Sequence, residues 1–219
     1  YCFSENFILP ISHDEVVYGK GSLINKMPGD YDMKFSGVRG FVAYMMAHPG
    51  KKLLFMGSEF GQFIEWNYKQ GLDWLLLQYD KNKMLSNYTK ELNKFYKDHS
   101  ELWEIDYSWD GFQWISSEDN CNSVIAFRRI NKAGDDIIAV FNWTPNSFDS
   151  YKIGVPDPGT YKVIFDSSLA KYGGSKPRLA GTYKSTKKPI HGFDQQIDIK
   201  LRGLSAVYLK KVEKKKKLN

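Results

Sequence analysis

Residues 7–20 read FILPISHDEVVYGK, an apolar run followed at once by the polar cluster Ser12-His13-Asp14-Glu15. The run Phe7–Ile11 is typical of a strand buried in a parallel sheet, and the cluster falls just past its carboxyl end. In α/β barrels the loops that carry the chemistry sit on that face. The same pattern fits a buried strand followed by a polar turn that caps the next segment. The residues alone leave both interpretations open.

The composition limits the class of protein. The 219 residues are 42% hydrophobic, which is enough for a substantial core and excludes wholesale disorder. The chain starts at Tyr1 with no charged leader, which predicts a piece of a longer protein. No stretch approaches the ~20 consecutive apolar residues that cross a bilayer, so we expect no membrane partner. Cys2 and Cys121 are too few for a disulfide framework or a metal site, which predicts a cytoplasmic location and no metal.

The net charge of +6 raises the possibility of a nucleic-acid partner. Much of the excess lies in the last residues of the chain, at Lys210, Lys211, Lys214, Lys215, Lys216 and Lys217. A terminal run of this kind is typical of a solvated tail, so we expect no nucleic-acid partner. Weak contact with a polyanion stays as the alternative.

The chain changes character near Glu104–Ser108. Before that point, the pattern predicts strands at 7–11 and 52–56 and helices at 32–47 and 84–102. Alternating strands and helices indicate a parallel sheet covered by helices, although two such units cannot close a barrel of eight strands. We therefore expect unpaired strand edges and exposed apolar helix faces in this half.

The second half is richer in short β-type runs separated by turn residues. The expected strands are 113–115, 123–129, 137–142, 150–153, 159–165 and 204–210. The Lys-rich stretch 173–188 lacks apolar periodicity and predicts a long exposed loop. An antiparallel β-sandwich is the simplest arrangement of these strands.

Acidic and aromatic side chains follow the second strand as well. Residues 55–74 read FMGSEFGQFIEWNYKQGLDW. Aromatic faces stack on sugar rings and carboxylates bind sugar hydroxyls, so the two strand ends together predict a carbohydrate site with Glu59 and Trp66 as substrate-binding residues. Loop packing is the alternative for Trp66 and Trp74. The chain shows no phosphate-binding loop and no metal-ligand spacing, so we expect no cofactor.

Three segments together resemble one family. They are LPISHDEVVYGKGSLINKMPGD, HPGKKLLFMGSEFGQ and EWNYKQGLDWLLL, at residues 9–30, 48–62 and 65–77. In this order and spacing they are similar to the C-terminal part of bacterial glycogen branching enzymes, members of the α-amylase family. The resemblance departs at Tyr18, where the family normally has histidine, and at Gly21, where it often has lysine.

The resemblance implies a fold and a division of the chain. Residues 1–106 would supply the last two strand–helix units of a (β/α)8 TIM barrel, residues 107–212 a C-terminal antiparallel β-sandwich, and residues 213–219 a basic tail. The expected partners are an α-glucan substrate and the N-terminal part of the same enzyme, which lies outside this chain.

The resemblance also implies a reaction. These enzymes cleave an α-1,4 linkage by a retaining double displacement and transfer the chain to a C6 hydroxyl, forming an α-1,6 branch. Asp14 inherits the role of the carboxylate that stabilises the transition state, and His13 that of a substrate-binding residue. The nucleophile and the acid/base would lie upstream of Tyr1, so the chain alone is expected to be inactive.

Two other classes remain open at this point. A related α-glucan debranching hydrolase would produce free reducing ends instead of new branches. A non-catalytic glucan-binding module would use aromatic side chains of the second half as a stacking platform, with candidates at Tyr107, Trp109, Trp114 and Trp143.

Overall fold

The computed structural model describes residues 5–212. Its first half contains the strands β1 (Ile8–Ile11) and β2 (Lys51–Leu54) and the helices α1 (Tyr31–Ala47) and α2 (Asp80–Asp98). Its second half contains β3 (Phe112–Asp119), β4 (Val124–Ile130), β5 (Asp136–Asn142), β6 (Phe148–Val155), β7 (Thr160–Asp166), β8 (Thr182–Lys184), β9 (Gln195–Leu201) and β10 (Ser205–Lys211). Within these described residues, no helix is long and apolar enough to span a membrane.

The first half forms two strand–helix units, as predicted. Strands β1 and β2 pair in parallel, and α1 makes the connection between them. Helix α1 begins where the Asp30 carboxylate accepts a hydrogen bond from the Met33 amide, and it ends at the sequence His48-Pro49-Gly50. Gly50 has a φ of +113°, which favours glycine and turns the chain into β2.

The second half is an antiparallel β-sandwich, also as predicted. A six-stranded sheet runs in the order β3-β4-β5-β10-β7-β8, and β6 pairs with β9 in a second layer. One face of the large sheet packs on that layer through residues such as Ile138 and Val140 of β5, which meet Ile153 of β6 and Ile197 of β9. The sequence alternates with period two along these strands because successive side chains point to opposite faces.

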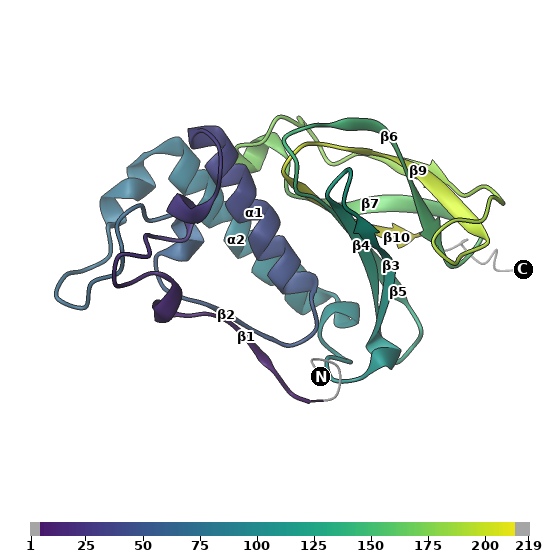
Figure 1. The fold of residues 1–219 in the computed structure, drawn as a ribbon, viewed down its shortest axis with the longest axis horizontal. Helices are drawn as coiled ribbons and strands as arrows, with labels where there is room; N and C mark the ends of the chain where they lie inside the picture. Colours follow the sequence, from purple (N-terminus) through teal and green to yellow (C-terminus); the bar gives the residue numbers. More distant parts are fainter. Residues whose placement is uncertain (1–4, 213–219) are drawn as a thin grey trace, which may run out of the picture.

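The other face of the large sheet is covered by the helices, so the two halves share one hydrophobic core. Phe141 of β5 faces α1, where its ring centroid lies 5.2 Å from that of Tyr44. The Tyr208 hydroxyl of β10 donates a hydrogen bond of 2.6 Å to the carbonyl oxygen of Ala43. Figure 1 shows both helices lying between the β1–β2 pair and the large sheet.

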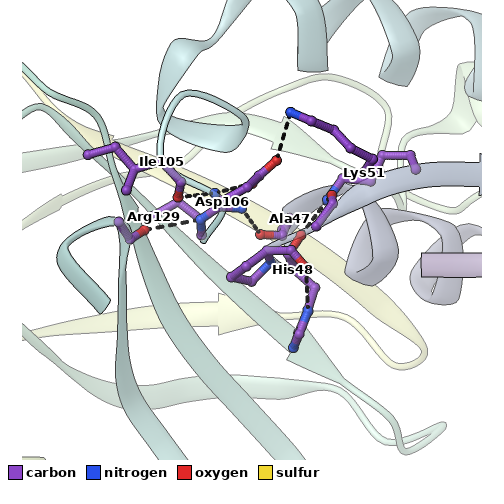
Figure 2. A network of polar contacts seen from close by, with 10 residues as sticks. Ala47, His48, Lys51, Ile105, Asp106 and Arg129 are labelled. Atoms are coloured by element: carbon purple, nitrogen blue, oxygen red, sulfur yellow. Dashed lines mark hydrogen bonds and ion pairs between the residues drawn. The ribbon is translucent and has the colours of Figure 1, made fainter. Parts of the chain in front are cut away.

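A buried arginine ties the two halves together at the end of α1. Arg129 of β4 is fully buried and donates hydrogen bonds to the carbonyl oxygens of Ala47, Gly111 and Ile105. Its guanidinium also pairs with Asp106, at 2.7 Å from Nη2 to Oδ1 (Figure 2). Burial lowers the pKa of Arg129, and the Asp106 carboxylate opposes that shift. The Asp106 carboxylate thus binds the buried Arg129 and also Lys51, at 3.3 Å, where the two halves meet.

The burial of the first half differs from the expectation. The apolar faces of α1 and α2 are not exposed, because the large sheet covers them. The strand β1 is the more open element: Ile11 is buried, whereas Ile8 is 59% exposed. Leu53 of β2 is 36% exposed on the same outer face of the pair, since it follows the same alternation in register with Pro10. The expected full burial of the first strand, β1, was therefore wrong within the described residues.

Two further differences concern the second half. Strand β8 forms inside the stretch that was expected to be a loop, and β9 was not expected at all. Lys210 and Lys211 are not part of a solvated tail, because they belong to β10 and pair with Glu101 and Asp157. The remaining tail lysines, at 214–217, lie outside the described residues.

Candidate functional site

The polar cluster after β1 folds into a short 3₁₀ helix, η1 (His13–Glu15). Ser12 is its N-cap, and its hydroxyl oxygen accepts a hydrogen bond of 3.3 Å from the Asp14 amide. The Glu15 carboxylate in turn accepts hydrogen bonds from the Ser12 amide, at 2.8 Å, and from the Ser12 hydroxyl, at 2.9 Å. This reciprocal arrangement is a capping box, and it fixes the turn at the strand end.

His13 and Asp14 meet on the outside of this turn. His13 Nε2 lies 3.2 Å from Asp14 Oδ1, and the two side chains are 51% and 65% exposed. Neighbours on an extended backbone would point apart, but the tight 3₁₀ turn brings these two together. The carboxylate therefore faces solvent with an imidazole at its side, which suits the binding of an uncharged polar ligand.

The loop after β2 brings an aromatic wall to the same place. The ring centroid of Trp66 lies 6.3 Å from that of His13 and 5.2 Å from that of Phe55. Phe55 is also 6.1 Å from His13, so the three rings form one cluster. The ends of parallel strands meet at one edge of a sheet, which is why residues from two loops converge here. Phe55 was not singled out in the sequence, although it directly follows the predicted strand end.

Glu65 holds the two loops together. Its carboxylate accepts hydrogen bonds from the Gly21 amide, at 2.6 Å, and from the Gly19 amide, at 3.2 Å. The neighbouring Trp66 amide donates to the carbonyl oxygen of Val16 at 3.1 Å. Between these anchors Tyr18 adopts a φ of +58° and is 90% exposed. Sequence reasoning did not find this role of Glu65, because its partners are backbone amides that any residue could supply.

Glu59 forms no hydrogen bond or ion pair with the cluster of His13, Asp14 and Trp66 among the described residues. It lies on the 3₁₀ helix η3 (Ser58–Phe60), and its carbonyl oxygen accepts a hydrogen bond from the Thr89 hydroxyl of α2. Among residues 5–212 its carboxylate has no hydrogen bond or ion pair with His13 or Asp14. The structure thus brings together His13, Asp14 and Trp66, and the role of Glu59 stays a prediction.

The proposed stacking platform of the second half is only partly on the surface. Trp143 packs into the shared core, stacked on Phe141 with centroids 5.9 Å apart. Trp114 is likewise packed against this core. Tyr107 and Trp109 are 53% and 61% exposed. Two of the four aromatic candidates therefore serve the interior of the protein.

The chemistry open to this site is limited by its carboxylates. Glu15 and Glu65 each bind backbone amides, which leaves Asp14 as the carboxylate of this turn that faces outward beside the aromatic rings. Hydrolysis or transfer at a glycosidic bond uses a pair of carboxylates, one as the acid and one as the nucleophile or base. The arrangement suits the binding of a sugar ring and the stabilisation of positive charge that develops on it.

Comparisons with known proteins agree with this picture. The family described as "Alpha amylase, C-terminal all-beta domain" matches residues 114–212. A debranching enzyme from Nostoc punctiforme superposes with a TM-score of 0.60 at 16% identity, over 94% of this chain and 35% of that one. An alpha-amylase from Geobacillus thermoleovorans, in complex with acarbose, superposes with a TM-score of 0.58 at 14% identity, over 82% of this chain and 34% of that one. At these identities the two structures support the fold alone.

The second half of the chain, at residues 114–212, is thus similar to the C-terminal domain of alpha-amylases, and two strand–helix units precede it. More narrowly, the chain is similar in sequence to the C-terminal portion of enzymes named 1,4-alpha-glucan branching enzyme GlgB. It is 53% identical over 211 residues to the enzyme of Halothermothrix orenii, covering 96% of this chain and 34% of the relative. The enzyme of Aquifex aeolicus is 47% identical over 211 residues, with the same coverage of 96% and 34%. The chain thus spans about a third of the length of these relatives.

Proposed function

We propose that this chain forms the substrate-binding end of a glucan branching enzyme, with Asp14 as the residue that stabilises the transition state. The observation that carries the proposal is the pairing of Asp14 with His13 at 3.2 Å beside Trp66, at the carboxyl ends of two parallel strands. The relatives named 1,4-alpha-glucan branching enzyme support the choice of substrate, an α-glucan.

In the proposed reaction a retaining double displacement breaks an α-1,4 bond and the glucan chain passes to a C6 hydroxyl. The Asp14 carboxylate would accept hydrogen bonds from hydroxyls of the sugar at the cleavage point, and these would strengthen as positive charge develops on the ring. His13 would donate to the same sugar, and the Trp66 indole would form one wall of the site through apolar contact. Glu59 would bind a more distant sugar of the chain.

The nucleophile and the acid/base belong to a part of the enzyme outside these residues in this proposal. That part would be the second partner of the chain, and it would cover the outer face of β1 and β2. The 219-residue chain alone would then show no branching or hydrolytic activity.

The test is Asp14→Asn in the full-length enzyme, which keeps the size of the side chain and removes its charge. We expect kcat to fall on the order of 10²–10³-fold with KM little changed, because the lost interaction forms mainly in the transition state. The readout is the rate of new α-1,6 linkages in amylose. The matched control is Asp110→Asn, which changes an exposed carboxylate in a similar serine-capped turn.

A full rate in Asp14→Asn would contradict the role of this residue. Turnover of amylose by the 219-residue chain alone would contradict the division of catalytic groups. Products with free reducing ends and no new branches would indicate a hydrolase instead.

A further inference from the structure

A small polar cavity lies where α1 meets three loops of the second half. Its volume is about 200 Å³. The walls come from α1, from the β5–β6 loop, from the segment after β7 and from the turn between β9 and β10. The side chains that matter here are Ser36, Arg39, Ser147, Ser168, Ser175 and Arg202. Two arginines and four serines line this cavity, which we call the arginine cavity.

Arg39 is buried without a carboxylate partner. It is only 2% exposed, and its Nε donates to the carbonyl oxygen of Ser167 at 2.9 Å. Its Nη2 donates to the Ser36 hydroxyl, also at 2.9 Å. No carboxylate of residues 5–212 forms an ion pair with it, in contrast to Arg129, which pairs with Asp106. Burial lowers the pKa of Arg39 to about 10, so the guanidinium stays charged at neutral pH.

Arg39 lines the cavity, and part of its guanidinium has no partner in the described part of the protein. Nη1 of Arg39 has no acceptor among the described residues. Nη1 is also in contact with solvent. Among residues 5–212, Asn82 Oδ1 is the only side-chain nitrogen or oxygen that is fully buried and has no hydrogen-bond partner, and Nη1 is therefore not fully buried. Water or a bound anion can therefore supply the acceptor that the protein does not.

The charges around the cavity leave an excess of positive charge. Arg202 lines the cavity and has no ion pair within residues 5–212. No carboxylate lines the cavity within residues 5–212. Asp32, whose charge acts on Arg39, pairs with Lys81 at 2.8 Å. Asp166, which accepts from the Ser168 hydroxyl, pairs with Lys176 at 2.7 Å. The field inside the cavity therefore favours an anion.

The loops that form the cavity are held in close contact. The Gly203 amide donates to the Ser147 hydroxyl at 3.1 Å. A Cβ added at Gly203 would lie 2.0 Å from the carbonyl oxygen of Pro145, and one added at Gly174 would lie 2.1 Å from that of Ser168. Only glycine permits these approaches of backbone to backbone, so the cavity exists before any ligand enters.

We propose that the arginine cavity binds a phosphate group, either as free phosphate or as the phosphomonoester of a sugar. A guanidinium such as that of Arg202 presents paired N–H donors that match the oxygens of phosphate. Two of the four serine hydroxyls, those of Ser36 and Ser168, already donate to oxygens of the protein. This leaves the hydroxyls of Ser147 and Ser175 to donate to the remaining oxygens of phosphate. The volume is below the ~300–1,000 Å³ of sites for larger organic ligands, which suits a phosphate group with at most a small substituent. Binding would bridge α1 to the loops of the second half.

Calorimetric titration of the full chain tests this proposal. The probes are inorganic phosphate, glucose 6-phosphate and glucose. We expect both phosphates to bind and glucose not to bind. Binding of inorganic phosphate alone would identify the free ion as the ligand, and tighter binding of glucose 6-phosphate would identify the phosphomonoester. Equal binding of glucose and glucose 6-phosphate, or no binding of either phosphate up to about 10 mM, would overturn the proposal.

Variants show whether the cavity is the site. Arg202→Gln should weaken phosphate binding about tenfold, and Arg39→Lys should also weaken it, because lysine keeps the charge but lacks the Nη1 donors. Arg178→Gln is the matched control, since Arg178 is an exposed arginine that does not line the arginine cavity. If Arg39→Lys does not fold, Arg202→Gln still shows whether phosphate binds in the arginine cavity. An equal loss in Arg178→Gln and Arg202→Gln would overturn the assignment.

Discussion

Two turns of the molecule share one local structure but differ in whether the aspartate carboxylate of the turn is bound by the serine of the same turn. The turns are η1 (His13–Glu15), after β1, and η6 (Trp109–Gly111), before β3. Each is a 3₁₀ helix with a serine N-cap, whose hydroxyl oxygen accepts from the aspartate amide two residues on, at 3.3 Å in η1 and 3.2 Å in η6. The difference lies in the serine hydroxyl proton.

In η6 the Ser108 hydroxyl donates to the Asp110 carboxylate at 2.8 Å, so the aspartate is bound within its own turn. In η1 the Ser12 hydroxyl donates instead to Glu15, and the Asp14 carboxylate pairs with His13. Gly111, three residues after Ser108, stands where η1 has Glu15, and it has no side chain that could accept from the serine hydroxyl. One residue beyond the aspartate thus decides whether its carboxylate is available to a ligand.

Among the variants that compare the two turns, Glu15→Ala in the full-length enzyme is expected to have the largest effect. Without Glu15, the Ser12 hydroxyl is free to bind the Asp14 carboxylate, as Ser108 binds Asp110. We expect kcat/KM for branching to fall about tenfold, since a competing hydrogen bond to the carboxylate costs ~1–2 kcal/mol. The double variant Ser12→Ala/Glu15→Ala removes the competitor and should recover most of the loss. A double variant as slow as Glu15→Ala would contradict this account.

Loss of either serine cap should have a smaller effect, on stability, and the effect should be the same in both turns. Ser12→Ala and Ser108→Ala each remove a serine cap with a bond of nearly the same length. We expect each to lower the free energy of unfolding by about 0.5–1 kcal/mol, measured by urea denaturation of the full chain. A loss at one serine only would mean that the turns are not equivalent in structure.

The smallest effect concerns pH and is confined to η1. The hydrogen bonds from Ser12 hold the pKa of Glu15 below its ordinary value of 4.5. Because the folded pKa is the lower one, the cap stabilises the fold above pH 4.5 and is lost as the pH falls through the folded pKa. An NMR titration should place the Glu15 midpoint below 4.5 in the native chain and nearer to it in Ser12→Ala. A native midpoint at 4.5 or above would argue against the capping box in solution.

The sequence predicted the bounds of several helices and strands better than it predicted what each of them packs against. Helix α1 was expected over 32–47 and spans Tyr31–Ala47, because its caps are local. Helix α2 begins at Asp80, four residues before the expected start, since its first turn carries polar side chains and shows no apolar period. Strand β9 alternates Ile197, Ile199 and Leu201, a signal that was overlooked beside the Lys-rich stretch before it.

The position of the candidate site residues was predictable as far as chain order allows, while their roles stay a prediction. The strand ends identified His13 and Asp14, and the meeting of parallel strands brought Trp66 to them. The anchoring of both loops by Glu65 could not be read from the sequence, because it depends on where the amides of Gly19 and Gly21 point. The covering of the helices by the large sheet was also hidden, since apolar periodicity shows which face is buried and not by what.

The position of β10 has a consequence for how the chain is made. It is the last strand among residues 5–212, yet it lies inside the large sheet between β5 and β7, and its Tyr208 hydroxyl donates to the carbonyl oxygen of Ala43. A ribosome releases α1 long before β10, so the helix face that β10 covers stays unprotected while most of the second half is still being synthesised. Folding of this region therefore waits for its final residues. A nascent chain that stops before β10 would expose an apolar surface and require a chaperone.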